Sequence, residues 1–263
     1  MLTAQQIQAR DGKLTASRVA CLMTGDATKI MNLWREMVGD PSFEPEDLSH
    51  VWPVQLGTAT EAINIAWYEM KQGDLTRKGE VVCHPLHDWA ACTLDGFDPV
   101  LPGPVECKHV GGWEPREAVV ARYAAQVHWQ MLCTGTYKAA LSIIEGAREP
   151  VIEPVDFDPV YATELFRRAE SFMECVWNLT PPIAGAPVAA PVRASIIIDM
   201  SASNEWCDAA VTWLENNASA EKAASAEKSL KGLVPAEATK AFGAGVAINR
   251  DRAGRLSLKK EAA

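Results

Sequence analysis

Three short apolar segments between helical stretches constrain the fold more than any other feature of this chain. Residues 80–83, 89–94 and 104–109 each have the length of a strand. The turn-forming residues around them are Pro85, Asp88, Asp98, Pro99, Pro102 and Gly103. Because short connections of this kind join neighbouring antiparallel strands, we predict an antiparallel meander.

Helical patterns lie on both sides of these segments. The stretch 122–133 contains no Gly or Pro and is followed by Gly135, a residue type common just beyond a helix end. The expected helices are 19–23, 57–68, 122–133 and 161–179, with a loop at 40–54 and a fourth strand at 138–144. The order helix, three strands, helix, strand is typical of an α/β fold with a mixed sheet.

A proline-rich stretch divides the chain. Residues 181–194 contain four prolines, which indicates a linker or an extended arm. Beyond it, 204–231 has the spacing of a helix, and the last residues alternate in polarity around a turn at 251–254, which predicts a β-hairpin. The expected organisation is a core at 1–180, a linker at 181–194 and a helix with a basic hairpin at 195–263.

Composition places the chain among globular proteins. Its 263 residues carry a formal charge of −9, and 48% are hydrophobic, which excludes a disordered or collagen-like chain. No apolar run approaches the roughly 18 residues of a membrane span, and residues 1–13 lack the apolar centre of a secretory signal. Seven scattered cysteines without a CxxC pair favour reduced thiols over disulfides. We therefore expect a cytoplasmic protein with no membrane partner.

Charge is unevenly distributed along the chain. Residues 217–263 hold nine Lys or Arg against five Asp or Glu, a local charge of +4, so the remainder carries −13. This acidic balance argues against binding of nucleic acid by electrostatics alone over the whole surface. The basic end is either a solvated face or a contact for nucleic acid or a partner.

Asp95, Glu106 and Lys108 form the pattern that carries chemistry. Glu106 and Lys108 are two residues apart on an expected strand, so their side chains share one face. A turn can bring Asp95 beside Glu106. Two carboxylates offer hard oxygen ligands to Mg²⁺ or Mn²⁺, and a neighbouring ammonium can stabilise charge on a reacting phosphate. Alone, the pattern also fits a solvated sheet face, but its apolar surroundings favour a functional site.

Five motifs then occur in an order that resembles a known family. They are Thr15-Ala16-Ser17, Gly57-x-x-x-Glu61, Leu94-Asp95-Gly96, Glu106-Cys107-Lys108 and Tyr123-x-x-Gln126-x-x-x-Gln130-Met131. Through them, residues 10–180 resemble the phage lambda exonuclease and YqaJ-type viral recombinase family of the PD-(D/E)xK nuclease superfamily. Leu94 stands where the superfamily name has proline. The resemblance implies a restriction-endonuclease-like core, in which helices flank a mixed central sheet.

The resemblance also implies roles for individual residues. Asp95 and Glu106 would bind the metal with the backbone carbonyl of Cys107, and Lys108 would act on the attacking water. Glu61 would hold a second metal through water. The other implied roles are Gln126 supporting Lys108 or the phosphate, Tyr123 beside it on the same helix face, and Arg10 with Ser17 binding a terminal 5′-phosphate. Ser17 could instead be a plain helix cap.

The implied activity is Mg²⁺-dependent digestion of linear double-stranded DNA from the 5′ end. The remaining 3′ strand would pass to a single-strand annealing protein during phage or prophage recombination in the bacterial cytoplasm. A homo-oligomer, specifically a trimeric ring around DNA, is also implied. Two alternatives stay open: an endonuclease or single-strand nuclease on the same fold, and a non-catalytic DNA-binding or assembly subunit.

Two further groups of residues have the chemistry for metal or DNA binding. Cys83, His84, His87 and Cys92 lack the usual spacing of a zinc site, so core or surface roles are favoured. Among the tryptophans, Trp89, Trp129, Trp177 and Trp213 are expected in the core. Trp113 follows the strand that carries Lys108, which makes it a candidate to stack on or wedge into a DNA end.

Overall fold

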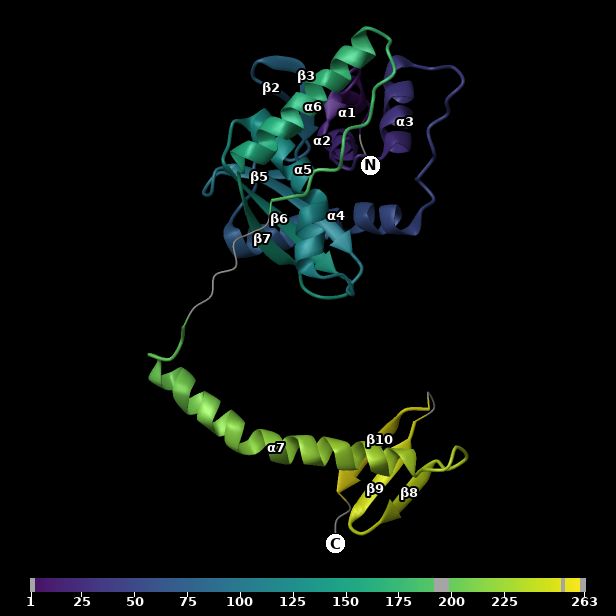
Figure 1. Cartoon of the computed structure of the whole chain (residues 1–263), viewed down its shortest axis with the longest axis vertical. Coiled ribbons are helices and arrows are strands. Elements are labelled where there is room, and N and C mark those ends of the chain that lie inside the picture. Colours follow the sequence, from purple (N-terminus) through teal and green to yellow (C-terminus); the bar gives the residue numbers. More distant parts are fainter. Residues whose placement is uncertain (1–2, 192–198, 252–253, 261–263) are drawn as a thin grey trace. The chain divides into compact units, whose positions relative to one another are not determined.

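The computed structural model describes residues 3–191, 199–251 and 254–260. The chain forms two compact units, Met1–Arg193 and Ala194–Ala263, which are described separately. The N-terminal unit contains β1 to β7 and α1 to α6 around its sheets (Figure 1). No described helix is both long and apolar enough to cross a bilayer.

A four-stranded mixed sheet lies at the centre of the N-terminal unit. Its strands are β4 (Gly96–Asp98), β5 (Gly103–Val110), β6 (Lys138–Glu145) and β7 (Val151–Asp156), in the order β4-β5-β6-β7. The β5–β6 pair is parallel and the two outer pairs are antiparallel. Parallel neighbours need a crossover, which α5 (Arg116–Thr134) supplies. The predicted mixed sheet flanked by helices is confirmed.

The predicted meander is wrong in one respect, because its three strands belong to two sheets. The first two, β2 (Val81–His84) and β3 (His87–Thr93), form an antiparallel hairpin beside the short β1 (Leu14–Thr15). The third, β5, pairs instead with β4, an unpredicted strand of three residues. Strand β4 was not predicted because turn-forming residues follow it directly. Asp98 ends the strand by accepting the amide N–H groups of Val100 and Leu101.

Helices α4 (Trp52–Gln72) and α5 extend beyond their predicted ranges, whereas α6 (Pro159–Trp177) begins and ends two residues earlier than predicted. The other helices of the N-terminal unit are α1 (Ala4–Ala9), α2 (Ala16–Val19) with a 3₁₀ turn at Ala20–Met23, and α3 (Ala27–Val38). The predicted loop at 40–54 therefore ends early. Pro53 was assigned to the loop, but it lies in the first turn of α4, where a missing N–H is tolerated. Gly135 ends α5 with a φ of 67°, as predicted.

The main core lies between α5, α6, the N-terminal helices and the β1–β3 sheet. Trp129 is fully buried, and its indole N–H donates to the Ala91 carbonyl at 3.0 Å. Trp89 packs against the same cluster, so both core predictions are confirmed. Trp177 and Trp213 are 55% and 62% exposed, so the corresponding predictions are wrong. Each lies on a helix face that no described neighbour fully covers.

Residues 181–191 of the proline-rich stretch run along the N-terminal unit without regular structure. The Val188 amide donates to the Met23 carbonyl at 2.9 Å, and Ala184, Val188 and Ala190 pack against the main core. Proline supplies no N–H, so an irregular path with few backbone hydrogen bonds suits this composition.

The C-terminal unit is a helix with a three-stranded sheet. Its helix, α7 (Asn204–Gly232), precedes β8 (Lys240–Gly243), β9 (Val246–Arg250) and β10 (Leu256–Lys260). The strands are antiparallel in the order β10-β9-β8. The predicted hairpin is confirmed as β9–β10, although residues 252 and 253 of its turn lie outside the described residues. The strand β8 was not predicted.

Candidate active site

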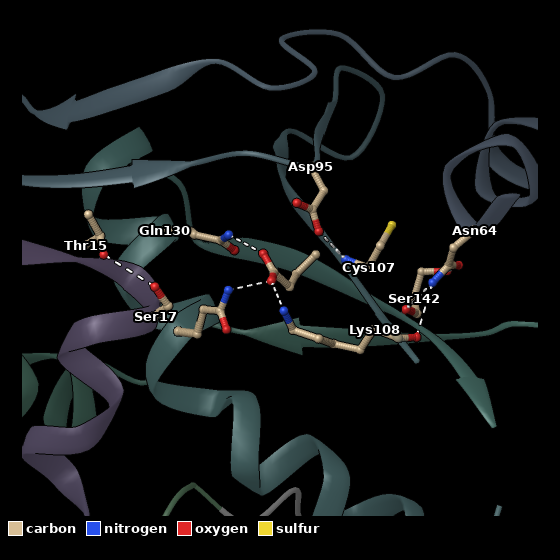
Figure 2. Close-up of polar contacts among 10 residues, drawn as sticks. Thr15, Ser17, Asn64, Asp95, Cys107, Lys108, Gln130 and Ser142 are labelled. Carbon is tan, nitrogen blue, oxygen red and sulfur yellow. Dashed lines mark hydrogen bonds and ion pairs between the residues drawn. The ribbon is translucent and has the colours of Figure 1, made fainter. Parts of the chain in front are cut away.

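The register of β4 and β5 brings Asp95 and Glu106 together. Gly96 pairs with Val105 across the ladder, so the same register continued by one residue sets Asp95 opposite Glu106. Side chains at such opposed positions share one face of the sheet. Asp95 is fixed there because its Oδ2 accepts the backbone N–H of Cys107 at 2.8 Å (Figure 2).

The Cys107 backbone faces the same side as Asp95. The N–H and C=O of one strand residue point in the same direction, as in a hydrogen-bonded pair that exchanges both bonds. Because the Cys107 N–H donates to Asp95, its carbonyl is also turned away from β6 toward this carboxylate. The Cys107 side chain is buried and its thiol is free. The carbonyl thus adds an oxygen donor to the two carboxylates.

Glu106 is the most enclosed member of the site. Its side chain is only 3% exposed, and three side chains donate to its carboxylate: Lys108 from the same strand, and Gln126 and Gln130 from α5. A buried carboxylate requires such partners. Figure 2 shows Gln130 and Lys108 converging on it from two elements. Gln130 was not predicted as a site residue, although its i, i+4 spacing from Gln126 places both amides on one helix face.

The charges of the site shift the pKa of several groups, among them Asp95 and Lys108. Burial, and to a lesser extent the Glu106 carboxylate, raises the pKa of Asp95 well above its usual range. The Lys108 ammonium and the Cys107 N–H lower the pKa of Asp95 but do not outweigh these effects. Burial lowers the pKa of Lys108, but the Glu106 and Asp95 carboxylates outweigh burial and the pKa is raised. The ammonium also lies 5.0 Å from the Tyr123 ring centroid, a cation–π contact. Two adjacent carboxylates share one ammonium, so the site favours additional positive charge.

A cavity of about 280 Å³ joins the predicted site residues. Its lining includes Arg10, Ser17, Glu61, Asp95, Glu106 and Gln126. Glu61 is exposed on α4 and also lines this cavity. Lys108, Tyr123 and Trp113 are not among the lining residues, and Trp113 is 94% exposed in the loop after β5. The structure thus brings six predicted residues to one cavity and leaves Trp113 outside it.

Arg10 lies among hydroxyl groups in this cavity. Its guanidinium donates to Thr93 Oγ1 and Thr15 Oγ1, both at 3.3 Å, and the Thr15 and Ser17 hydroxyls are 3.4 Å apart. Burial and the nearby Arg18 lower the pKa of Arg10. Among the described residues no carboxylate forms an ion pair with it. A partly buried cation with hydroxyl neighbours is suited to an anion.

Ser17 is not the helix cap. Thr15 occupies the N-cap position of α2, and Ser17 is the second residue of that helix. The alternative reading of Ser17 as a cap is therefore wrong, and its hydroxyl stays available to the cavity. Thr15 and Thr93 were not predicted as site residues, since isolated threonines give no distinctive pattern.

The donor set suits a hard divalent ion with part of its water shell. In the described part of the chain, no group of three or more His, Cys, Asp or Glu side chains is arranged to hold a metal. Two carboxylates and one carbonyl instead match Mg²⁺, which retains several waters and takes few protein ligands. The residues weighed for zinc lie elsewhere: the His84 and His87 rings contact Phe166.

Comparisons with known proteins agree with this fold. Residues 6–137 match the model of the YqaJ-like viral recombinase domain. The fold is similar to an alkaline exonuclease, LHK-Exo, from Laribacter hongkongensis, with a TM-score of 0.56 and 22% identity over 67% of this chain and 94% of that chain. LHK-Exo in complex with dAMP gives the same TM-score and coverage at 23% identity. Comparison with curated protein sequences finds no match.

Proposed function

Because the chain belongs to the family of YqaJ-like viral recombinase domains, we propose that it is a Mg²⁺-dependent deoxyribonuclease that digests linear duplex DNA from the 5′ end. One observation carries this proposal: a single cavity holds Asp95, Glu106 and Glu61 together with Arg10 and Ser17. Carboxylates suit a metal and a scissile phosphate, whereas the arginine and hydroxyl suit a second, terminal phosphate.

Asp95, Glu106 and the Cys107 carbonyl would hold the metal ion, with Glu61 reaching a second ion through water. When bound, Mg²⁺ makes a water molecule more acidic and neutralises charge on the scissile phosphate, with Mn²⁺ as a substitute. Burial and the like charge of Glu106 already raise the pKa of Asp95, so the pair is stabilised by any cation placed between them.

Lys108 orients the attacking water and stabilises negative charge that develops on phosphate oxygens. Its ammonium is held by Glu106 and by the face of Tyr123, which fixes it before substrate arrives. Gln126 lines the cavity and donates to Glu106. Its amide therefore keeps the carboxylate in one rotamer beside the phosphate.

Arg10 and Ser17 would bind the terminal 5′-phosphate. The terminal phosphate carries more charge than an internal phosphodiester, so this end of the cavity selects a free 5′ end and favours an exonuclease over an endonuclease. Tyr123 and the exposed Trp113 would contact the DNA strand next to the cavity. LHK-Exo, whose fold is similar, was solved with dAMP, a mononucleotide of the kind such digestion releases.

The biological setting follows from the family. The 3′ single strand left after digestion would pass to a single-strand annealing protein in phage or prophage recombination, within the bacterial cytoplasm. A trimeric ring would keep the duplex enclosed. The competing functions are an endonuclease or single-strand nuclease on the same fold, and a non-catalytic DNA-binding or assembly subunit. Neither would shorten linear duplex from its ends in the experiment below.

Digestion of linear plasmid tests this function. Wild-type protein with Mg²⁺ should shorten linear duplex and leave covalently closed circles intact, and EDTA should stop the reaction. Asp95→Asn removes one metal-binding charge at constant size, and we expect at least a 100-fold lower rate, about 2.7 kcal/mol in barrier height. Asp88→Asn, at an exposed position outside the cavity, is the matched control. Equal digestion by Asp95→Asn and wild type would reject the site, and cleavage of closed circles would favour an endonuclease.

A further inference from the structure

The sheet of the C-terminal unit has two faces of different chemistry. In the register of β8, β9 and β10, Ala241, Ile248 and Leu258 are aligned on one face. These three are buried or half-buried, and α7 packs against β10 in the same unit (Figure 1). This apolar face is the inner face of the sheet.

The outer face carries cations and polar groups. Its aligned residues are Lys240, Asn249 and Ser257 in one row, and Phe242, Ala247 and Lys259 in the next. All four residues on the outer strands are exposed. The three strands contain four basic residues and no acidic residue. The register places two of them, Lys240 and Lys259, on the outer face, whereas Arg250 and Lys260 lie in the rows of the inner face. In a chain with a formal charge of −9, the strand positions of this outer face therefore carry two cations and no acidic residue.

Phe242 gives this face a second feature. Its side chain is 73% exposed, and the Lys240 ammonium lies 5.3 Å from its ring centroid. The ring lies beside Ala247 in the strand register, and most of its surface stays open to a ligand. Beside lysines, such a ring can lie against sugars or bases while the ammonium groups contact phosphates.

We propose that this outer face, defined by Lys240, Phe242, Asn249, Ser257 and Lys259, binds the backbone of duplex DNA. Lysines neutralise phosphates, and the Asn and Ser side chains supply neutral hydrogen bonds of the kind that position proteins on a duplex. Sheets of this width enter or follow DNA grooves in other proteins. An acidic protein surface would also attract the lysines, but it would leave the exposed ring unused.

The contact gives the C-terminal unit a function that the catalytic cavity does not supply. This second DNA-binding site rests on the proposed nuclease function. It would hold duplex DNA near the enzyme during repeated cleavage. Binding is measured without cleavage, so the two proposals can fail separately.

Fluorescence anisotropy of the full-length protein tests the surface. The probe is a labelled blunt 30-base-pair duplex in EDTA, titrated at several salt concentrations. The double variant Lys240→Ala/Lys259→Ala should bind at least about tenfold more weakly, with a salt slope smaller by about 1.8, because each phosphate contact contributes about 0.9. Phe242→Ala should weaken binding without changing the slope.

Lys222→Ala/Lys228→Ala is the matched control. It removes the same charge from exposed positions on α7 of the same unit, and we expect less than a twofold change. Equal losses in the two double variants, or none in either, would overturn the proposed surface. An unchanged rate for Asp95→Asn in the plasmid assay would instead reject the catalytic site and leave the binding result intact.

Discussion

Ser142 and Asn64 form a buried hydrogen-bonded pair next to β5, the strand that carries Glu106 and Lys108. Ser142 Oγ donates to Asn64 Oδ1 at 2.6 Å, and the Asn64 amide nitrogen donates to the Ser142 carbonyl at 2.9 Å and to the Lys108 carbonyl at 3.3 Å (Figure 2). Both residues are almost fully buried. Asn64 is one turn after Glu61 on α4, so this pair joins the helix that carries Glu61 to the strand that carries Lys108.

Asn64→Leu should destabilise the protein by about 2–4 kcal/mol. The substitution keeps the branched outline of the side chain but leaves the Ser142 hydroxyl and two carbonyls without their buried partner, each costing about 1–3 kcal/mol before relaxation. Urea unfolding monitored by circular dichroism measures the change. Ser142→Ala removes one hydroxyl and should cost about half as much, and the double variant should show coupling. Strictly additive losses would contradict a shared network.

Gln130→Leu should reduce digestion about 10- to 100-fold through the metal site. Gln130 donates to Glu106 Oε2 from the fully buried face of α5, and loss of a group that orients a metal ligand typically costs this much in metal affinity or activity. We expect the Gln130→Leu variant to need a higher Mg²⁺ concentration than wild type to reach its half-maximal rate. Gln72→Leu, at the exposed end of α4, is the control. A lower rate at all Mg²⁺ concentrations, with the half-maximal concentration unchanged, would contradict this role.

Much of the site could be predicted from the sequence because strand period and motif order are local properties. Glu106 and Lys108 are two residues apart, so any strand places them on one face. Asp95 was harder: the predicted meander was wrong, yet Asp95 still lies opposite Glu106, because the β4–β5 hairpin imposes the same antiparallel relation. The predicted proximity of Asp95 and Glu106 is therefore correct, because it depends on strand pairing near Asp95 and not on the sheet to which β3 belongs.

The missed features depend on tertiary context. Strand β7 (Val151–Asp156) contains Pro154 and charged residues, which argue against a strand, but its position at the edge of the sheet tolerates proline. Asn64 and Ser142 are common polar residues whose roles follow only from burial. Trp177 and Trp213 have helical spacing, but spacing alone cannot show whether a neighbouring element covers a face.

Arg10→Ala should remove the preference for a 5′-phosphorylated end. Arg10 is the cation of the cavity that lies among the Thr15, Ser17 and Thr93 hydroxyls, and a charged hydrogen bond is worth about 1.5–3 kcal/mol. Wild type should therefore digest phosphorylated duplex roughly 10- to 150-fold faster than duplex with 5′-hydroxyl ends, and the variant should digest both at the slower rate. Arg18→Ala is the control, since Arg18 pairs with Glu36 and does not line the cavity.

The same comparison separates the competing activities. An endonuclease would not distinguish the two ends, whether or not Arg10 is present. If Arg10→Ala slows both substrates by the same factor, Arg10 contacts an internal phosphate instead of the terminal one. End-labelled duplexes resolved by electrophoresis report both rates in one experiment.

His128 should make the stability of the N-terminal unit depend on pH. Its ring is buried, Nδ1 lies 2.8 Å from the Ala124 carbonyl, and Nε2 accepts the Asp158 amide at 3.1 Å. This arrangement requires the neutral ring. Burial lowers the pKa of His128 from 6.5 and outweighs the Ala124 carbonyl and the Asp158 charge, which both raise it. The unfolded chain then binds a proton at a higher pH than the folded chain, so this contribution is complete above about pH 6.5 and declines as the pH falls toward the folded pKa.

Urea unfolding at pH 7.5 and pH 5.5 measures this effect. Wild type should lose stability on acidification relative to His128→Gln, which cannot titrate, so the stability difference between the two proteins should narrow at the lower pH. His50→Gln is the control because the His50 side chain is 86% exposed, and its pH dependence should follow wild type. A stability difference between wild type and His128→Gln that stays constant from pH 7.5 to 5.5 would show that His128 keeps its ordinary pKa in the folded chain.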